Sequence, residues 1–328
     1  VFGQPRLFKE EIEEVVETIR SGWWGTGPKS HEFEDKFADY VQAKYAIALN
    51  SATAGLHLAL DVLRVGPGDE VITTPLTFVS TVNVVMHRGA TPVFADIDPV
   101  TWNIDPKQIE RKITSKTKVI LPVHLHGRPC YMDGIGRLAR KYKLKVVEDA
   151  AHATESWYKG KKIGAISDIT VFSFYATKNL ATAEGGMLTT NNKKVASEVR
   201  IKSLHGISKD AWKRYSAAGF TPYEAIYPGY KYNMPDIIAS LGLPHLKRLG
   251  QNLRIRKKYW RLLNQGLKDI PGIILPPDEQ PGTVHARHLY AIVIDPKRLK
   301  INRNEFVSAL KAEGIGAGVH FDPVHLHK

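Results

Sequence analysis

Cysteine is almost absent from this chain of 328 residues, since Cys130 is the only one. A single cysteine cannot form an internal disulfide, which excludes a disulfide-stapled scaffold and favours a reducing compartment. Long apolar runs are also missing, because no stretch approaches the ~20 residues that a membrane helix needs. The first residues do not show the basic-then-apolar layout of a signal peptide. We therefore expect a cytoplasmic protein that does not enter a membrane.

Acidic residues are in deficit, with 33 Asp and Glu against 46 Lys and Arg and a pI near 9.6. The basic residues are scattered through helical stretches such as 137–145 and 254–261 and are not condensed into one tail. A solvated basic surface is the favoured explanation, followed by a positive field that attracts an anionic small substrate. Nucleic-acid binding comes third.

Short apolar, β-branched runs alternate with helical patterns between residues 45 and 200. Amphipathic segments such as 53–64 and 132–142 separate the runs, and the glycines of 66–69 mark a tight loop. This alternation predicts an α/β fold with a mostly parallel sheet between helices. The seven predicted strands are 46–49, 70–73, 91–95, 118–121, 145–148, 169–173 and 187–189.

The last third of the chain has a different pattern, and we expect it to form a smaller α+β domain over 231–328, after a large domain over 1–230. One long helix is predicted over 234–267. It is followed by a strand-like segment over 288–294, a helix over 304–313 and a short segment over 315–321. The sequence ends without a terminating element, so we expect this domain to be incomplete.

Chemistry-bearing residues gather at the ends of the predicted strands, where ligands bind in open α/β sheets. Small and hydroxyl residues, Ser51, Ala52 and Thr53, stand at the start of a helix, where free backbone N–H groups can hold an anion. Serine and threonine are also ordinary helix caps. The segment therefore predicts an anion cradle only in combination with other signals.

An acidic pair, Glu148 and Asp149, ends the next candidate strand. Burying a carboxylate is costly unless it has a cationic partner. A protonated pyridine nitrogen would be such a partner for Asp149, and a structural ion pair is the alternative.

A lysine, Lys178, follows the strand that ends at Ser173, next to small and hydroxyl residues. A lysine held there can lose its proton near neutral pH and attack an aldehyde, whereas a lone lysine is usually a solvated surface residue. The glycines of Glu184-Gly185-Gly186 allow close packing on this loop. An anion cradle, an acid for a pyridinium and an amine nucleophile together form the partner set of pyridoxal 5′-phosphate.

These segments resemble the DegT/DnrJ/EryC1/StrS family of sugar aminotransferases, which have the fold-type-I, aspartate-aminotransferase-like architecture. The resemblance includes Gly229-Tyr230-Lys231-Tyr232-Asn233 and runs almost from end to end. The remaining matching segments are 25–28, 51–55, 66–72, 89–93, 122–124, 148–153, 172–179, 184–186 and 314–320.

The resemblance implies roles for individual residues. Lys178 would form the Schiff base to pyridoxal phosphate and shuttle a proton, and Asp149 would pair with the ring nitrogen. Phe78 would stack on the ring and His152 would lie near its 3-oxygen. The phosphate would be held by Ala52, Thr53 and Ser173.

The resemblance also implies a homodimer with shared active sites. A second subunit would complete each site through the loop 229–233, with either Lys231 or Asn233 on the phosphate. His320 resembles a histidine that approaches the sugar, although a structural role is equally open.

The implied reaction transfers an amino group from L-glutamate, which leaves as 2-oxoglutarate, to a nucleotide-linked 4-keto-sugar. Lysine at 178 favours transamination over the dehydration performed by relatives with histidine there. The motifs look most like enzymes that make UDP-4-amino-4-deoxy-L-arabinose, so a UDP-4-keto-pentose is favoured. A UDP- or dTDP-linked 4-keto-6-deoxyhexose and GDP-perosamine chemistry stay open.

Two other functions are possible from the sequence. One is an enzyme of the same fold that acts on amino acids, for which Arg287 is the only obvious carboxylate partner. The other is a non-catalytic regulator or nucleic-acid binder, supported only by the basic pI. No metal is expected: His124, His126 and His205 lack a metal-binding pattern. Trp23 and Trp24 are expected to pack the N-terminal arm.

Overall fold

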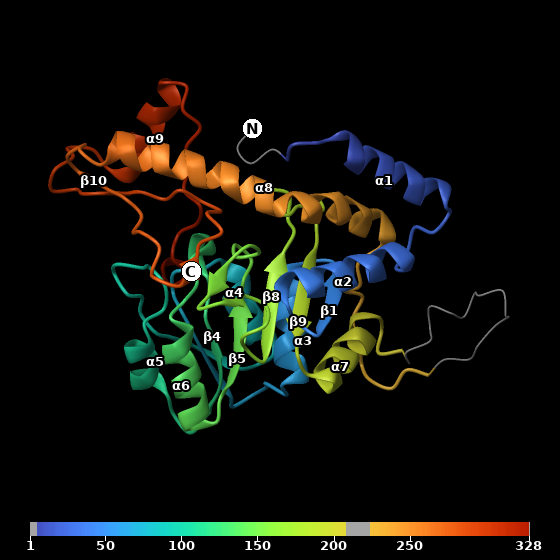
Figure 1. Cartoon of the computed structure of the whole chain (residues 1–328). Helices are drawn as coiled ribbons and strands as arrows, with labels where there is room; N and C mark the ends of the chain where they lie inside the picture. The colour runs from blue at the N-terminus through green and yellow to red at the C-terminus, as the bar shows by residue number, and fades with distance from the viewer. Residues whose placement is uncertain (1–4, 208–223, 328) are drawn as a thin grey trace.

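A seven-stranded sheet forms the centre of the molecule (Figure 1), in a computed structural model that describes residues 5–207 and 224–327. The strand order is β1-β9-β8-β5-β4-β2-β3, and β9 alone runs antiparallel to its neighbours. All seven predicted strands are confirmed, with each end within one residue. The strands are β1 Tyr45–Leu49, β2 Glu70–Thr73, β3 Thr91–Phe94, β4 Thr117–Leu121, β5 Lys145–Asp149, β8 Ile169–Ser173 and β9 Gly186–Thr190.

Helices cover both faces of this sheet, so its strands are apolar on both sides. In β1, Ile47 and Leu49 join the core with one helical layer, while Ala46 and Ala48 join the core on the other face. Successive side chains of a strand point to opposite faces, which explains the near-continuous apolar runs in the sequence. One layer contains α3 Ala52–Val62, α4 Val79–His87 and α7 Lys193–Ser203; the other contains α2 Pro28–Val41, α5 Pro106–Lys112, α6 Met132–Tyr142 and the first half of α8 Asp236–Leu267.

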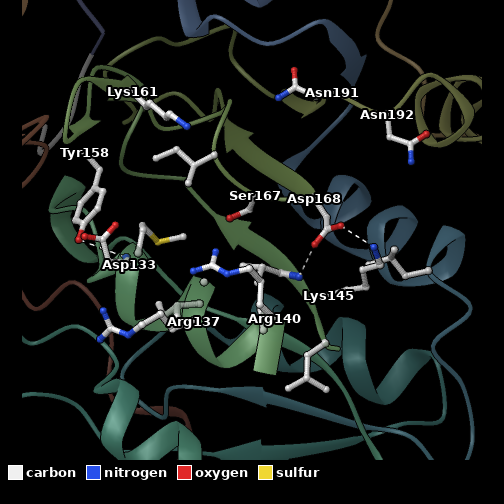
Figure 2. Close-up of a pocket in the computed structure, with 18 of the residues that line it drawn as sticks. Asp133, Arg137, Arg140, Lys145, Tyr158, Lys161, Ser167, Asp168, Asn191 and Asn192 are labelled. Carbon is white, nitrogen blue, oxygen red and sulfur yellow. Dashed lines mark hydrogen bonds and ion pairs between the residues drawn. The ribbon is translucent and has the colours of Figure 1, made fainter. Parts of the chain in front are cut away.

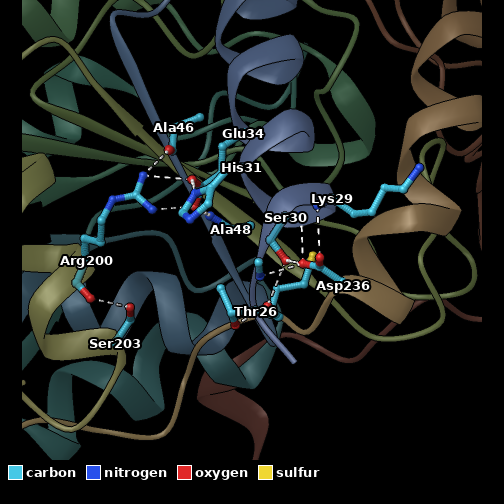
Figure 3. Close-up of polar contacts among 12 residues, drawn as sticks. Thr26, Lys29, Ser30, His31, Glu34, Ala46, Ala48, Arg200, Ser203 and Asp236 are labelled. Carbon is cyan, nitrogen blue, oxygen red and sulfur yellow. Dashed lines mark hydrogen bonds and ion pairs between the residues drawn. The ribbon is translucent and has the colours of Figure 1, made fainter. Parts of the chain in front are cut away.

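The long helix α8 is tied to the sheet region through its first residue (Figure 3). Asp236 accepts hydrogen bonds from the backbone N–H groups of Gly27, Lys29 and Ser30 at 2.7, 3.0 and 2.9 Å. These donors begin α2 and have no partner within that helix, so Asp236 supplies the cap that Gly27 cannot provide. The helix α1 Lys9–Arg20 packs along α8 (Figure 1).

The C-terminal part contains little sheet. The predicted strand over 288–294 is wrong except at β12 Val293–Ile294, which pairs with β10 Ile273–Ile274. The segment 315–321 contains no strand, and α9 Arg303–Ala312 agrees with the predicted helix. The strand β11 Thr283–Val284 pairs instead with β6 Trp157–Tyr158, which also pairs with β7 Lys161–Lys162.

The physical reason for this difference is that the backbone after β11 bonds to the large unit. The N–H groups of Ala286 and His288 donate to the carbonyls of Gly127 and His126, both at 3.0 Å. The tail also returns to the sheet, where the N–H of Val324 donates to the carbonyl of Pro75 at 2.8 Å. No helix among residues 5–207 and 224–327 is long and apolar enough to cross a membrane.

Candidate active site

The predicted site residues meet at the carboxyl ends of the strands. Asp149 ends β5, Ser173 ends β8, and the loop after β8 carries Lys178. The N-terminus of α3 follows β1 at the same edge. This convergence is a property of parallel strands, whose carboxyl ends share one edge of the sheet.

Asp149 is a buried carboxylate with donors but no cation. Its Oδ2 accepts the Thr81 hydroxyl at 2.9 Å, and its Oδ1 accepts the N–H of Ala151 at 3.1 Å. Among the described residues, no lysine or arginine lies within ion-pair distance of it, and its exposed fraction is 5%. Burial raises the pKa of Asp149, and the hydrogen bonds only partly offset this. The carboxylate would therefore gain from a cationic partner.

Lys178 is half-buried at the same edge. Burial lowers the pKa of its amine from 10.5 to about 8, while the charge of Asp149 acts in the opposite direction. The amine is therefore mostly protonated near pH 7, but roughly a tenth of it is neutral, far more than at an ordinary lysine. The neutral form is the one that a nucleophile or a proton acceptor requires.

Four histidines form a cluster: His126, His152, His288 and His320. The last three lie near enough to Lys178 for its charge to act on them. The ring of His152 stacks on that of His288, with centroids 4.6 Å apart, and lies 4.9 Å from that of His320. Burial is the main cause of lowered pKa values at His126, His152 and His288, and the positive charge of Lys178 contributes at His152 and His288. The buried imidazoles are therefore neutral.

Hydrogen bonds determine which nitrogen carries the proton in two of these rings. The backbone N–H of His126 donates to His152 Nδ1 at 3.2 Å, so the proton of neutral His152 is on Nε2, which faces His320 Nε2 at 3.1 Å. Asn179 donates to Glu155 and to a backbone carbonyl, so its oxygen accepts from His288 Nδ1 at 3.0 Å. His288 Nε2 is then an unprotonated acceptor, buried and without a hydrogen-bond partner among residues 5–207 and 224–327.

The start of α3, where we expect the phosphate to bind, has a capped first turn. Ser51 caps this helix by accepting the N–H of Ala54 at 3.1 Å, leaving Ala52 and Thr53 in the first turn. Gly186 lies directly beneath, because a Cβ there would come within 2.6 Å of the Ala52 nitrogen. Glycine at 186 thus allows β9 to approach the cradle.

Phe78 immediately precedes α4 and is 55% exposed, with its ring 6.3 Å from that of Phe321. A large exposed aromatic ring at a strand-end edge is available to stack on a planar ligand. The predicted stacking residue is therefore positioned beside the segment that carries His320.

The two residues of the loop 229–233 differ in their surroundings. Lys231 is exposed and uses its backbone carbonyl to accept from Asn50 Nδ2 at 3.2 Å. The Asn233 side chain is engaged within its own chain, where Nδ2 donates to Thr26 Oγ1 at 2.6 Å.

Sequence reasoning missed Thr81, His126 as a cluster member, and His288. Thr81 lies in the first turn of α4, three residues after Phe78, and its contact is with a residue 68 positions away. His124 points elsewhere: its Nε2 lies 2.6 Å from Glu148 Oε2, and both side chains are fully buried. Glu148, the first member of the acidic pair, is therefore partnered by a histidine within the fold. Among the described residues, no group of three or more His, Cys, Asp or Glu could hold a metal ion.

Arg287 interacts with two other side chains of the protein, Trp260 and Glu279. Its guanidinium lies 4.6 Å above the Trp260 ring and 3.3 Å from Glu279 Oε1. Trp23 and Trp24 bond to nearby carbonyls of Thr26 and Ile19 and keep exposed faces.

A basic depression of about 1310 Å³ lies at the opposite edge of the sheet (Figure 2). It is lined by Lys145 at the start of β5 and by Asp168 just before β8, which pair at 2.8 Å. Asp149 and Lys178 stand at the other ends of these strands. This depression is therefore separate from the candidate active site.

A buried acid and a lysine of lowered pKa at the carboxyl edge of this sheet are the groups that a pyridoxal-phosphate-dependent aminotransferase needs for its cofactor. Residues 5–328 match the DegT/DnrJ/EryC1/StrS aminotransferase family, and the chain belongs to this family.

Individual relatives agree with this assignment. Spore coat polysaccharide biosynthesis protein SpsC of Bacillus subtilis is 52% identical over 327 residues, covering 99% of this chain and 84% of that protein. The uncharacterized protein MJ1066 of Methanocaldococcus jannaschii is 51% identical over 324 residues, with the same two coverages.

A solved structure also matches the whole fold. Spr1654 from Streptococcus pneumoniae, described as a sugar aminotransferase, has a TM-score of 0.93 in its PMP form and is 39% identical, covering 100% of this chain and 86% of that one. Its PLP form has a TM-score of 0.91. The predicted family and fold are confirmed, and these two forms agree with the predicted cofactor.

Proposed function

We propose that this chain is a pyridoxal-phosphate-dependent aminotransferase that moves an amino group from L-glutamate to a nucleotide-linked 4-keto-sugar, with a UDP-4-keto-pentose as the favoured acceptor. The observation that carries the proposal is the pairing of a low-pKa amine at Lys178 with an uncompensated buried carboxylate at Asp149. The relative named for spore coat polysaccharide biosynthesis supports a sugar acceptor and a role in polysaccharide biosynthesis.

The residues present fit the cofactor at each of its ends. Asp149 forms no ion pair with the described residues and suits a protonated ring nitrogen, and Phe78 offers an open ring face. The first turn of α3, with Ala52 and Thr53, offers backbone N–H groups to a phosphate, and Ser173 ends the adjacent strand β8. When bound, pyridoxal phosphate supplies a carbonyl that amines attack and a ring that withdraws electrons from them.

Lys178 acts at its Nζ atom. Its lowered pKa leaves part of the amine unprotonated, so Nζ can bond to the cofactor carbonyl or accept a proton from a substrate carbon. Neutral His152 and His288 add no positive charge beside it, so they do not suppress its remaining basicity by like-charge repulsion.

The sugar substrate is preferred over an amino-acid acceptor for two reasons. The only arginine suggested for a substrate carboxylate, Arg287, is already engaged by Glu279 and Trp260. His152 donates from Nε2 and His320 accepts at Nε2, and such neutral groups suit hydroxyls better than a second carboxylate. We infer that His320 contacts the sugar.

A cytoplasmic homodimer with shared sites is part of the proposal. Lys231 is exposed, and its side chain forms no ion pair or hydrogen bond with the described residues, so it could reach a partner's phosphate. Asn233 Nδ2 instead donates to Thr26 within its own chain. This contrast favours Lys231 as the residue that crosses to the other subunit. The division into units 1–230 and 231–328 stays part of the proposal, although residues 283–288 and the first half of α8 pack on the larger unit.

The test is the visible absorption of the purified protein with pyridoxal phosphate, before and after adding L-glutamate. We expect a cofactor band that glutamate bleaches in the wild type and in Lys193→Ala, a matched control in the basic depression, but not in Lys178→Ala. Absence of any band in the wild type refutes the proposed cofactor, and a band that ignores glutamate refutes the donor.

The acceptor is then identified by adding 4-keto-sugars to the glutamate-treated enzyme. UDP-4-keto-pentose, dTDP-4-keto-6-deoxyhexose and a GDP-linked 4-keto-6-deoxyhexose are compared by return of the cofactor band. Fastest return with the UDP-pentose supports the favoured acceptor. Faster return with either hexose replaces it, and return only with keto acids supports the amino-acid alternative.

A further inference from the structure

A chain of two hydroxyl groups ends at the carboxylate of Asp149. The hydroxyl of Thr77 lies 2.8 Å from that of Thr81, which lies 2.9 Å from Asp149 Oδ2. Thr77 and Thr81 are 1% and 0% exposed, so water does not compete for these bonds. We propose that Thr81, supported by Thr77, is a positioning residue that orients the Asp149 carboxylate toward the ring nitrogen of the cofactor.

The direction of the chain follows from the number of protons available. An ionised carboxylate only accepts, so Thr81 must spend its single hydroxyl proton on Asp149. The oxygen of Thr81 is then left to accept, and Thr77 becomes its donor. Each bond polarises the next, so the chain delivers a stronger hydrogen bond to Asp149 than one hydroxyl would alone.

The remaining contacts of Asp149 leave the carboxylate dependent on Thr81. Its backbone is fixed on both sides, by donation to the Pro122 carbonyl and by acceptance from the His124 N–H. Among the described residues, the only other hydrogen bond to this carboxylate comes from the N–H of Ala151, on Oδ1. Loss of the Thr81 hydroxyl would therefore leave Oδ2 without a donor and free to rotate.

The same chain links two predicted contacts of the cofactor. Phe78 stands between Thr77 and the first turn of α4, and its carbonyl accepts the N–H of Thr81 at 3.1 Å. The turn that presents the Phe78 ring is thus bonded to the carboxylate that faces the ring nitrogen. Both groups would be held in a fixed relation before the cofactor arrives, which reduces the ordering that binding requires.

The test compares cofactor affinity in Thr81→Val, Thr81→Ser and a control. Valine keeps the shape of threonine and removes the hydroxyl, and serine restores it. Thr170→Val is the matched control, since Thr170 is also buried and donates to the adjacent acid, Glu148 Oε1, at 3.1 Å. Circular dichroism and thermal unfolding of the cofactor-free proteins show whether each variant is folded.

This inference rests on the proposed function, and the outcomes separate the two. A hydrogen bond to a charged group contributes roughly tenfold or more in binding. We expect Thr81→Val to weaken pyridoxal-phosphate binding about tenfold, with Thr81→Ser and Thr170→Val close to the wild type. If the wild type binds pyridoxal phosphate and Thr81→Val binds it with the same affinity, the positioning role is overturned and the proposed function is not. No binding by the wild type overturns both.

A second measurement distinguishes positioning from a merely structural role. Removing the Thr81 donor raises the pKa of Asp149 further, because the ionised form loses a hydrogen bond. As the pH is lowered, Thr81→Val should therefore lose cofactor binding at a higher pH than the wild type or Thr170→Val, because its Asp149 is protonated sooner. The same pH profile in all three proteins would refute the proposal even if the affinity of Thr81→Val is reduced.

Discussion

Replacing Lys178 by methionine is expected to stabilise the cofactor-free protein near neutral pH. The wild-type amine is half-buried, and burial lowers its pKa from 10.5 to about 8. The folded state therefore carries its positive charge at a cost that the unfolded state does not have. Methionine is of similar length and has no charge, so the variant avoids this cost.

The magnitude and its pH dependence follow from linkage. Below about pH 8 the lysine is protonated in both states, and the full cost is present, about 3 kcal/mol at ~1.4 kcal/mol per factor of ten in ionisation. Between pH 8 and 10.5 the unfolded state binds more protons, so wild-type stability rises with pH relative to the variant. Above pH 10.5 the amine is neutral in both states and the cost is gone. About 3 kcal/mol is an upper limit, because a half-buried side chain can move toward water.

The assay is urea unfolding of wild type and Lys178→Met without cofactor, followed by circular dichroism from about pH 7 to about pH 10. The difference between the two free energies of unfolding isolates Lys178, because other titrations cancel. We expect the variant to be more stable near pH 7, by up to about 3 kcal/mol, with the gain shrinking as pH rises. Lys193→Met, at an exposed lysine, should show no such trend. A difference independent of pH, or a variant less stable near pH 7, would refute the reasoning.

Three further predictions concern other parts of the site. Gly186→Ala should lower the free energy of unfolding by about 1–3 kcal/mol and weaken cofactor binding, because the added Cβ would meet backbone at the start of α3. The control is Gly250→Ala in α8, where the added Cβ would meet nothing within 4 Å. In the same unfolding and binding assays this control should be neutral or stabilising. Arg256→Met should lower the free energy of unfolding in urea by about 3 kcal/mol, since it leaves the carboxylate of Glu155, 1% exposed, without its cation; an unchanged midpoint would contradict this. The pKa of His126 is lowered to about 4, chiefly by burial, so its ring NMR signals should not titrate between about pH 5.5 and 8, and a midpoint near 6.5 would show that the ring is solvated.

Several features of the site could be predicted because they depend on local sequence. A carboxylate placed directly after the apolar run of β5 has to lie at the carboxyl edge of a parallel sheet, and Asp149 does. Lys178 was expected at that edge for the same reason. The small residues that begin α3 follow β1 directly, so the position of the cradle also follows from the order of elements along the chain.

The histidine cluster could not be predicted in this way. His152 and His320 are 168 residues apart, and the tail that carries His320 has no strand or helix pattern that places it. The segment carrying His288 was expected to be a strand, but its backbone bonds to His126 instead. Such contacts form between distant segments through packing, which periodicity does not report.

The amino-acid sequence by itself determined the layered α/β fold, because strands that are apolar on both faces can only be buried between helices. It also determined which chemical groups stand at the edge of the sheet. The tertiary structure decided how those groups are held. Thr81 donates to Asp149, and Asn233 donates to Thr26. His152 is unprotonated at Nδ1 and His288 at Nε2. Hydrogen-bond direction depends on distances and angles between residues remote in the chain, and these exist only once the chain has folded.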